Sequence, residues 1–189
     1  MKTTNILIAG VGGQGLVLAT RIISMTAFAE GYDVKSGDVI GLSQRGGNVW
    51  GSVRFGAEVF SPMIPNGEGD ILLALEELEA LRWLHLMRSS ATIILNKKNI
   101  YPNRVLIEKE KYPAAIADQL TAGGYNVIPV DGKALARESG NEKTENIALL
   151  GRLSLHTPFK YETWVEIIKK NVPAKTIDAN IKAFDFARE

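Results

Sequence analysis

The first residues whose spacing could support chemistry form the glycine-rich loop GVGGQG at positions 10–15. Gly10, Gly12 and Gly15 match a dinucleotide-binding fingerprint, in which glycines permit a tight turn and close backbone approach. A helix starting after this loop would offer free N–H groups and a positive dipole end to an anion. Asp38 could then hold a ribose, although it lies further along the chain than usual. The simpler interpretation is a structural or interface role for the glycines, with NAD or FAD binding as the alternative.

A second loop, GLSQRGG, ends at Gly47. Arg45 offers a rigid fork of donors for a phosphate or carboxylate group. Ser43 and Gln44 add neutral hydrogen-bonding groups, and Gly46 lets the backbone fold tightly beside them. At the carboxyl end of a parallel sheet such a loop faces the crevice where α/β proteins bind ligands. Taken alone, it could also be a polar surface loop that carries an arginine.

Three acidic residues, Glu76, Glu77 and Glu79, are close enough in sequence to suggest acid–base pairing. Negative charge is favourable in the first turn of a helix, so a structural role is the simpler interpretation. Glu76, at the end of an expected strand, is the one that we expect to face a site. His85 shares a helix face with leucines and is expected to be packed or partly buried rather than catalytic.

Charge is nearly balanced, at a formal net charge of +1, so nothing favours nucleic acid or an anionic membrane as a partner. Lys97, Lys98 and Arg104 form a short basic stretch, most simply a solvated surface, with an anionic ligand or acidic ferredoxin as the alternative. No run of about 20 apolar residues could span a bilayer, and the N-terminus does not resemble a signal peptide. We therefore expect a cytoplasmic protein that contacts neither membrane nor nucleic acid.

The sequence contains no cysteine and two histidines, His85 and His156. Iron–sulfur clusters are held mainly by cysteine thiolates, and structural zinc by cysteine and histidine. We therefore expect no metal site in this chain. Any iron–sulfur chemistry that it serves must reside on another polypeptide.

The elements that position the two loops follow from the hydrophobic pattern. A continuous apolar run at 5–9 predicts a buried parallel strand. The nearly uncharged stretch 16–30 predicts a helix packed on more than one side, where a partner chain could cover the second side. Apolar and polar residues alternate at 49–55, which predicts a strand, and 56–62 is expected to turn into a short return strand. Further strands are expected at 32–38, 70–75, 91–96 and 126–130, and helices at 76–88, 113–122, 144–155, 161–171 and 174–188, with helical pattern from 133 onward.

Helices that alternate with strands predict parallel βαβ units. We therefore expect one domain over residues 1–189 with a Rossmann-like α/β fold. Its sheet is expected to be mostly parallel with flanking helices, a small β-excursion and a helical C-terminus.

The combination of loops resembles the γ-type subunit of 2-oxoacid:ferredoxin oxidoreductases. The segment SQRGG is most similar to the small (β) subunit of indolepyruvate ferredoxin oxidoreductase. Ile40 stands where the family often has histidine, and Trp50 where small or polar residues are more usual. Beyond the two loops, the resemblance is carried by VRFG at 53–56, Ser61, Pro62, Gly69, Asp70, Glu76, LEALR at 78–82, Asn146, LLGRLS at 149–154, Pro173, Asn180, Ala183 and Phe184.

The resemblance implies that thiamine diphosphate and the Fe–S clusters lie on a large partner subunit. That complex would oxidatively decarboxylate an aryl or other 2-oxoacid with coenzyme A (CoA) and pass electrons to ferredoxin. This chain would be catalytically silent alone, with no catalytic residues, and would help to receive CoA at the interface, with Arg45 as the main anion contact. The residues expected to line that face are Gly12, Gly13, Gln14, Gly15, Ser43, Gln44, Arg45, Gly46 and Gly47.

The residues agree with this division of labour, because the sequence contains neither a thiamine diphosphate signature nor a Walker A motif. Two alternatives remain: a stand-alone Rossmann-type reductase or sensor that binds NAD(P) or FAD, and a pure assembly scaffold. The isolated chain could also form a homodimer. The identity of the 2-oxoacid is not encoded here, because its selection would rest largely on the partner subunit.

Overall fold

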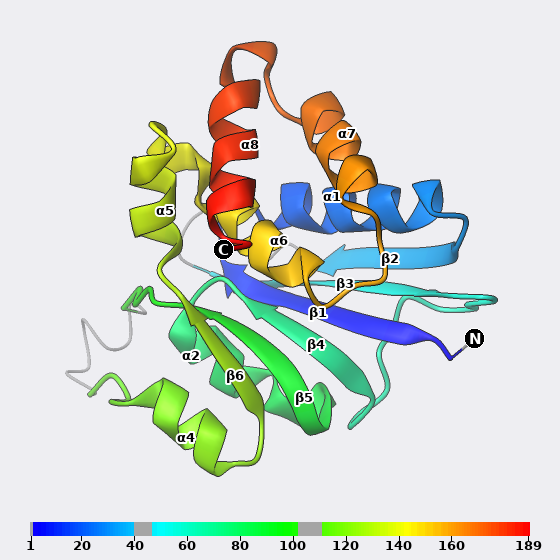
Figure 1. The fold of residues 1–189 in the computed structure, drawn as a ribbon. Coiled ribbons are helices and arrows are strands. Elements are labelled where there is room, and N and C mark those ends of the chain that lie inside the picture. Colours follow the sequence, from blue (N-terminus) through cyan, green and yellow to red (C-terminus); the bar gives the residue numbers. More distant parts are fainter. Residues whose placement is uncertain (1, 40–46, 102–110) are drawn as a thin grey trace.

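The structure is a computed structural model that describes residues 2–39, 47–101 and 111–189. Six strands form one sheet in the order β2-β3-β1-β4-β5-β6 (Figure 1). Only β3 runs against the others, so the expected α/β architecture with a mostly parallel sheet is confirmed. The strands are β1 (Thr4–Val11), β2 (Asp33–Val39), β3 (Asn48–Gly56), β4 (Gly69–Ala74), β5 (Met87–Asn96) and β6 (Asn126–Val130).

Strand β1 is central because its side chains are apolar on both faces. Ile6 and Ile8 are fully buried in the core on one face of the sheet, and Leu7 and Ala9 in the core on the other. This explains why its sequence is a continuous apolar run rather than an alternating one. The edge strand β6 carries Pro129, whose missing N–H group is tolerated at an edge.

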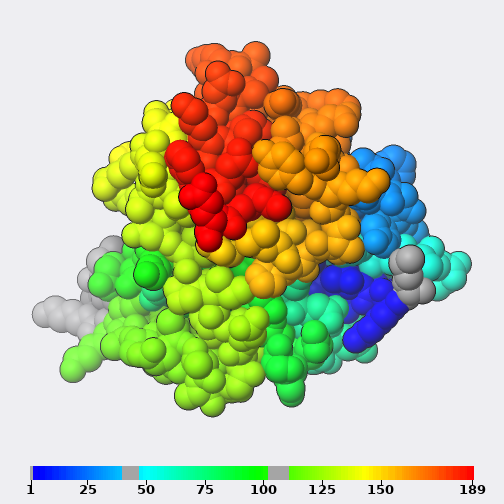
Figure 2. Space-filling model, viewed as in Figure 1, coloured from blue at the N-terminus to red at the C-terminus, as the bar shows by residue number. Residues whose placement is uncertain are grey.

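Helices cover both faces of the sheet. On one face lies α1 (Leu16–Ala29) together with the C-terminal helices, and on the other lie α2 and α4 (Figure 1). In Figure 2 the orange and red atoms of α7 and α8 form one continuous block. The remaining bounds are α2 (Glu77–Arg82), α4 (Ile116–Ala122), α5 (Gly132–Glu138), α6 (Glu145–Ser154), α7 (Tyr161–Asn171) and α8 (Ile177–Phe186), with short 3-10 turns η1 (Leu84–Leu86), η2 (Glu142–Thr144) and η3 (Ala174–Thr176).

The second apolar side of α1 is covered by this chain itself. Helix α7 packs along α1, where Asn171 Nδ2 lies 3.4 Å from Met25 Sδ. Glu30, just after α1, accepts a hydrogen bond from the Lys160 backbone N–H (3.1 Å) and another from the Thr163 hydroxyl. Val17 and Phe28 of α1 are nevertheless exposed, at 48% and 75%, so this chain covers only part of the apolar surface of the helix.

Strand β3 differs from the expected excursion. It lies inside the sheet between β1 and β2, and residues 57–68 return without forming a strand. That return segment is bound across β3 by side chains: Ser52 Oγ donates to the Pro62 carbonyl (2.7 Å), and Arg54 Nη1 donates to the carbonyls of Ser61 (3.1 Å) and Met63 (2.8 Å). Side-chain bonds to its carbonyls thus replace strand pairing.

The helix expected at 76–88 is also shorter than its pattern suggested. Helix α2 ends at Arg82, η1 follows, and β5 already begins at Met87. Helix α2, on the face of the sheet that it shares with α4, is therefore only six residues long. Among the described residues, no helix combines the length and the apolarity needed to cross a membrane.

Candidate functional site

The glycine loop between β1 and α1 is held by the side chain of Gln14. The Val11 backbone N–H donates to Gln14 Oε1 (2.7 Å), and Gln14 Nε2 donates to the Leu75 carbonyl (2.7 Å). A Cβ atom at Gly10 would lie 2.9 Å from Gln14 Oε1, so only glycine leaves room for this amide. Gln14 thus ties the carboxyl end of β1 to that of β4.

Two further glycines set the conformation of this loop. Gly13 and Gly15 have φ angles of 99° and 77°, in the left-handed region that favours glycine. Gly15 is also the N-cap of α1, and its carbonyl accepts a hydrogen bond from Asn146 Nδ2 (3.3 Å). The first turn of α1 has neither a side-chain cap nor an acidic residue. Its N–H groups and the positive end of its dipole are therefore available to an anion.

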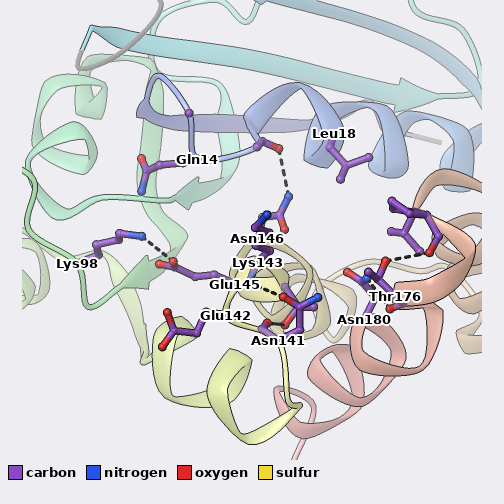
Figure 3. Close-up of a pocket in the computed structure, with 15 residues that line it drawn as sticks. Gln14, Leu18, Lys98, Asn141, Glu142, Lys143, Glu145, Asn146, Thr176 and Asn180 are labelled. Atoms are coloured by element: carbon purple, nitrogen blue, oxygen red, sulfur yellow. Dashed lines mark hydrogen bonds and ion pairs between the residues drawn. The ribbon is translucent and has the colours of Figure 1, made fainter.

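A pocket of about 520 Å³ opens at this helix start, beside the carboxyl ends of the parallel strands. Figure 3 shows residues of the glycine loop on one side and residues around η2, α6 and α8 on the other. Its volume is in the range of small-molecule sites. The lining residues are Gly13, Gln14, Gly15, Leu18, Lys98, Asn141, Glu142, Lys143, Thr144, Glu145, Asn146, Val172, Pro173, Thr176 and Asn180.

Glu145, the first residue of α6, organises the polar wall of the pocket. Its Oε2 pairs with Lys98 Nζ (2.6 Å), and its Oε1 accepts from Asn96 Nδ2 (2.7 Å), as Figure 3 shows for the lysine. Asn96 is 1% exposed and also bonds the Leu75 carbonyl (3.0 Å) and the Gly132 N–H (3.2 Å). These bonds hold the Lys98 ammonium group in the wall of the pocket that also contains Gly15, the N-cap of α1.

This geometry suits binding better than proton transfer. The ionisable residues that line the pocket are two lysines and two glutamates, and the better buried glutamate, Glu145, is already paired with Lys98. A helix N-terminus together with a fixed ammonium group is a setting for a phosphate or carboxylate group. Leu18 and Val172 add apolar surface for the rest of a ligand.

The structure brings part of the predicted site together. Gly13, Gln14 and Gly15 line the pocket, and the Gly12 N–H donates to the Gly47 carbonyl (2.9 Å), so the glycine loop touches the end of the second loop. The amide of Gln14 is engaged within the loop itself. The other four predicted residues, Ser43, Gln44, Arg45 and Gly46, lie outside the described residues, and their role stays a prediction.

Asp38 lies one strand further from β1 than the ribose-binding residue of a dinucleotide fold, because β3 separates β2 from β1. Its carboxyl faces Thr20 on α1, and a Cβ atom at Gly51 would overlap it. Burial raises the pKa of Asp38, although the hydrogen bond with Thr20 lowers it. Asp38 is an exposed residue near the end of β2, and its carboxyl is engaged by Thr20.

Glu76 does not face the pocket, contrary to expectation. It is 1% exposed and caps α2: Oε2 accepts from the Glu79 N–H (2.9 Å), and Oε1 accepts from the Ile100 N–H (3.0 Å) and from the Tyr112 hydroxyl. The structural interpretation of this carboxylate therefore holds. His85 is exposed and stacks on Trp83, with ring centroids 5.8 Å apart. The expectation that it is packed or partly buried was wrong as regards burial, because α2 ends at Arg82 and His85 lies in the exposed turn that follows.

The far wall of the pocket was not predicted as part of the site, although Asn146, Pro173 and Asn180 are among the residues that carry the family resemblance. Thr176 and Asn180 bond only within their own segment, to the carbonyls of Pro173 and Thr176, so their sequence gives no sign that they face the glycine loop. Lys98 did give a signal, as part of the basic stretch, and of the two described lysines in that stretch it is the one that lines the pocket.

The comparisons with known proteins cover nearly the whole chain. The model of the family pyruvate ferredoxin/flavodoxin oxidoreductase matches residues 5–189. The indolepyruvate oxidoreductase subunit IorB of Thermococcus kodakarensis is 38% identical over 98% of this chain and 94% of that protein. The subunit of the same name from Archaeoglobus fulgidus is 36% identical over 95% of this chain and 90% of that protein.

Solved structures share the fold. The gamma subunit of keto/oxoacid ferredoxin oxidoreductase from Geobacter sulfurreducens superposes with a TM-score of 0.72 at 22% identity, covering 97% of this chain and 95% of that one. The 2-oxoglutarate:ferredoxin oxidoreductase of Magnetococcus marinus matches with a TM-score of 0.76 at 18% identity, over all of this chain but 31% of its own. The family model and the full-length relatives show that the chain belongs to the pyruvate ferredoxin/flavodoxin oxidoreductase family.

Proposed function

We propose that this chain is the small subunit of a 2-oxoacid:ferredoxin oxidoreductase of the indolepyruvate type, acting in the cytoplasm within a hetero-oligomer. The observation that carries the proposal is the 38% identity to an indolepyruvate oxidoreductase subunit over 98% of the chain. The chain alone is inactive in this proposal, and its large partner subunit selects the 2-oxoacid.

The residues fit this division of labour. Thiamine diphosphate on the partner supplies the decarboxylation chemistry, and Fe–S clusters there carry electrons to ferredoxin. This chain has no cysteine with which to hold a cluster. Among the residues that the structure describes, no group of three or more histidines, aspartates and glutamates could hold a metal ion.

The pocket supports a role in receiving CoA at the interface. CoA carries phosphate groups, which suit the uncapped start of α1 and the ammonium group of Lys98. Glu145 keeps that ammonium group in place, and Leu18 offers an apolar contact. In the proposed complex the glycine loop, together with Ser43, Gln44, Arg45, Gly46 and Gly47, lines the face toward the thiamine-bearing subunit.

The test is to produce the large subunit with and without this chain. CoA-dependent oxidation of indolepyruvate, phenylpyruvate and pyruvate is then measured with ferredoxin as the acceptor. We expect activity only in the complex. Full activity of the large subunit alone would refute the proposal.

A matched pair of lysine variants tests the pocket. Lys98→Gln removes the ammonium group at α1 and is expected to raise the KM for CoA about tenfold, the usual effect of one charged hydrogen bond. Lys170→Gln removes an exposed lysine that is paired with Glu166 on α7, away from the pocket, and should leave this KM unchanged. Equal KM values in both variants would exclude the pocket as the CoA contact.

The fingerprint loop keeps a stand-alone NAD(P)- or FAD-binding reductase or sensor as the second candidate. Titration of the purified chain with NAD(H), NADP(H) and FAD separates the two. Micromolar binding supports the second candidate, and no binding supports the subunit. A pure scaffold predicts instead that Arg45→Ala leaves CoA dependence unchanged, while substitutions within residues 16–30 abolish assembly.

A further inference from the structure

A second pocket, of about 440 Å³, lies at the opposite end of the sheet from the first. It opens where β1 and β4 begin, beside the N-terminal segment drawn in dark blue in Figures 1 and 2. Its ionisable lining residues are Lys2, Arg54, Glu68 and Arg88. Basic side chains thus converge here from the N-terminal segment, from β3 and from β5.

An irregularity in β5 places Arg88 at this pocket. The pairing of β4 with β5 shifts between Gly69 and Ile71, so that β5 has extra residues there. Ser90, within the extra residues, takes a left-handed φ of 59°, which is uncommon for a residue other than glycine. Bulges of this kind redirect side chains. Arg88 Nε pairs with Asp70 Oδ1 (2.8 Å), which leaves its two terminal nitrogens without a bond to any described residue.

Arg54 carries a charge that no described carboxylate balances. Its Nε donates to Asn5 Oδ1 (2.8 Å), and its Nη1 donates to two backbone carbonyls of the segment after β3. All three acceptors are neutral. Its remaining nitrogen, Nη2, is bonded to none of the described residues and belongs to a side chain that lines the pocket. A half-buried guanidinium group that has only neutral partners favours an anion nearby.

The charges around the pocket do not cancel. Asp70 is occupied, because its second oxygen accepts a hydrogen bond from the Asn5 backbone N–H (2.9 Å) while the first holds Arg88. Glu68 lines the pocket, so two described carboxylates, Asp70 and Glu68, stand against the three cations Lys2, Arg54 and Arg88, and a net positive charge remains. We propose that this pocket binds a small oxyanion, a phosphate or carboxylate group, between Arg54, Arg88 and Lys2. The site is independent of the pocket assigned to CoA.

The test is a titration of the full chain, labelled with ¹⁵N, with inorganic phosphate, acetate and chloride at matched ionic strength. We expect saturable shifts of the amide signals of residues 2–5, 67, 68 and 88 with phosphate or acetate, and none with chloride. Stronger binding of phosphate identifies a phosphate group as the ligand chemistry, and stronger binding of acetate identifies a carboxylate. Either result supports the site.

Arginine variants give a matched control. Arg88→Gln is expected to weaken the anion about tenfold. Arg137→Gln should not, although Arg137 also makes one Nε–carboxylate bond of 2.8 Å, to Glu142, outside the pocket. Lys2→Gln provides a second test, because Lys2 makes no side-chain bond within the described structure and its loss should not disturb folding. Shifts that do not saturate by roughly 50 mM anion, that chloride reproduces, or that survive Arg88→Gln and Lys2→Gln unchanged would overturn the proposal.

Discussion

Glu79 provides the sharpest prediction about this fold, because it is an acidic residue buried in the core. It is 2% exposed on α2, and its Oε1 lies 3.2 Å from Arg82 Nη1. Its Oε2 and the nearby Trp83 Nε1 are both buried, and neither makes a hydrogen bond of normal geometry to a described residue. Burial raises the pKa of Glu79 to about 7; Arg82 and the Trp83 indole N–H lower it, and Glu76 adds a further rise.

The pKa of Glu79 is therefore higher in the folded chain than the ordinary value of 4.5 that it takes when unfolded. Between these two values the folded state binds more protons, so this residue makes the free energy of unfolding decrease as the pH rises. Its favourable contribution is complete below pH 4.5 and is lost above pH 7. A pKa change of this size corresponds to about 3 kcal/mol.

The substitution Glu79→Gln keeps the shape of the side chain and removes its ionisation. We expect the variant to gain stability relative to the wild type as the pH rises from 5 to 8, by roughly 2–3 kcal/mol in the difference between the two proteins, because part of the full effect already falls below pH 5. Urea unfolding at pH 5, 6, 7 and 8, followed by tryptophan fluorescence, measures this difference. The attraction between Arg82 and ionised Glu79 is already included in this difference, because Arg82 lowers the pKa of Glu79.

Glu166→Gln is the matched control. Glu166 is exposed, and its hydrogen bond with Lys170 lowers the pKa of its carboxyl, so it stays ionised from pH 5 to 8. Its stability difference from the wild type should be flat over this range. If the Glu79→Gln difference is equally flat, the carboxyl is ionised at both ends of the range, and the reasoning from burial is wrong.

Two further predictions concern the carboxyl end of the sheet. Gly15→Ala should destabilise the chain more than Gly13→Ala. A left-handed alanine costs about 1–2 kcal/mol at either position, but only at Gly15 would the new Cβ also lie 2.5 Å from Asn146 Nδ2. Equal losses of stability in thermal unfolding would contradict the clash. Tyr112→Phe should lower the free energy of unfolding in urea by about 2–3 kcal/mol, because it removes a hydrogen bond to the buried Glu76 carboxylate and leaves the Leu78 N–H of α2 unpaired. A loss below about 0.5 kcal/mol would mean that water replaces the hydroxyl.

The central strands were predictable because burial on both faces requires an unbroken run of apolar residues, which can be recognised in the local sequence. In β1, Ile6 and Leu7 point to opposite cores, so the run is apolar throughout and needs no knowledge of its neighbours. The position of β3 was not predictable in the same way. The alternation around Val53 predicts a strand, but strand partners are chosen by contacts far apart in sequence, here Ile6 with Val53. The missing return strand has a similar cause, since Arg54 binds the segment after β3 through its carbonyls.

The sequence predicts the glycine loop, but the role of the loop depends on residues far away in the sequence. The spacing of the glycines can be read locally, whereas one of the two bonds of the Gln14 amide reaches Leu75 and the other Val11. The turn is therefore held by the protein's own bonds and needs no dinucleotide to stabilise it. Asn146 packs against Gly15 from a helix that begins 130 residues later. The same glycines thus serve strand and helix packing and leave the start of α1 open at the pocket.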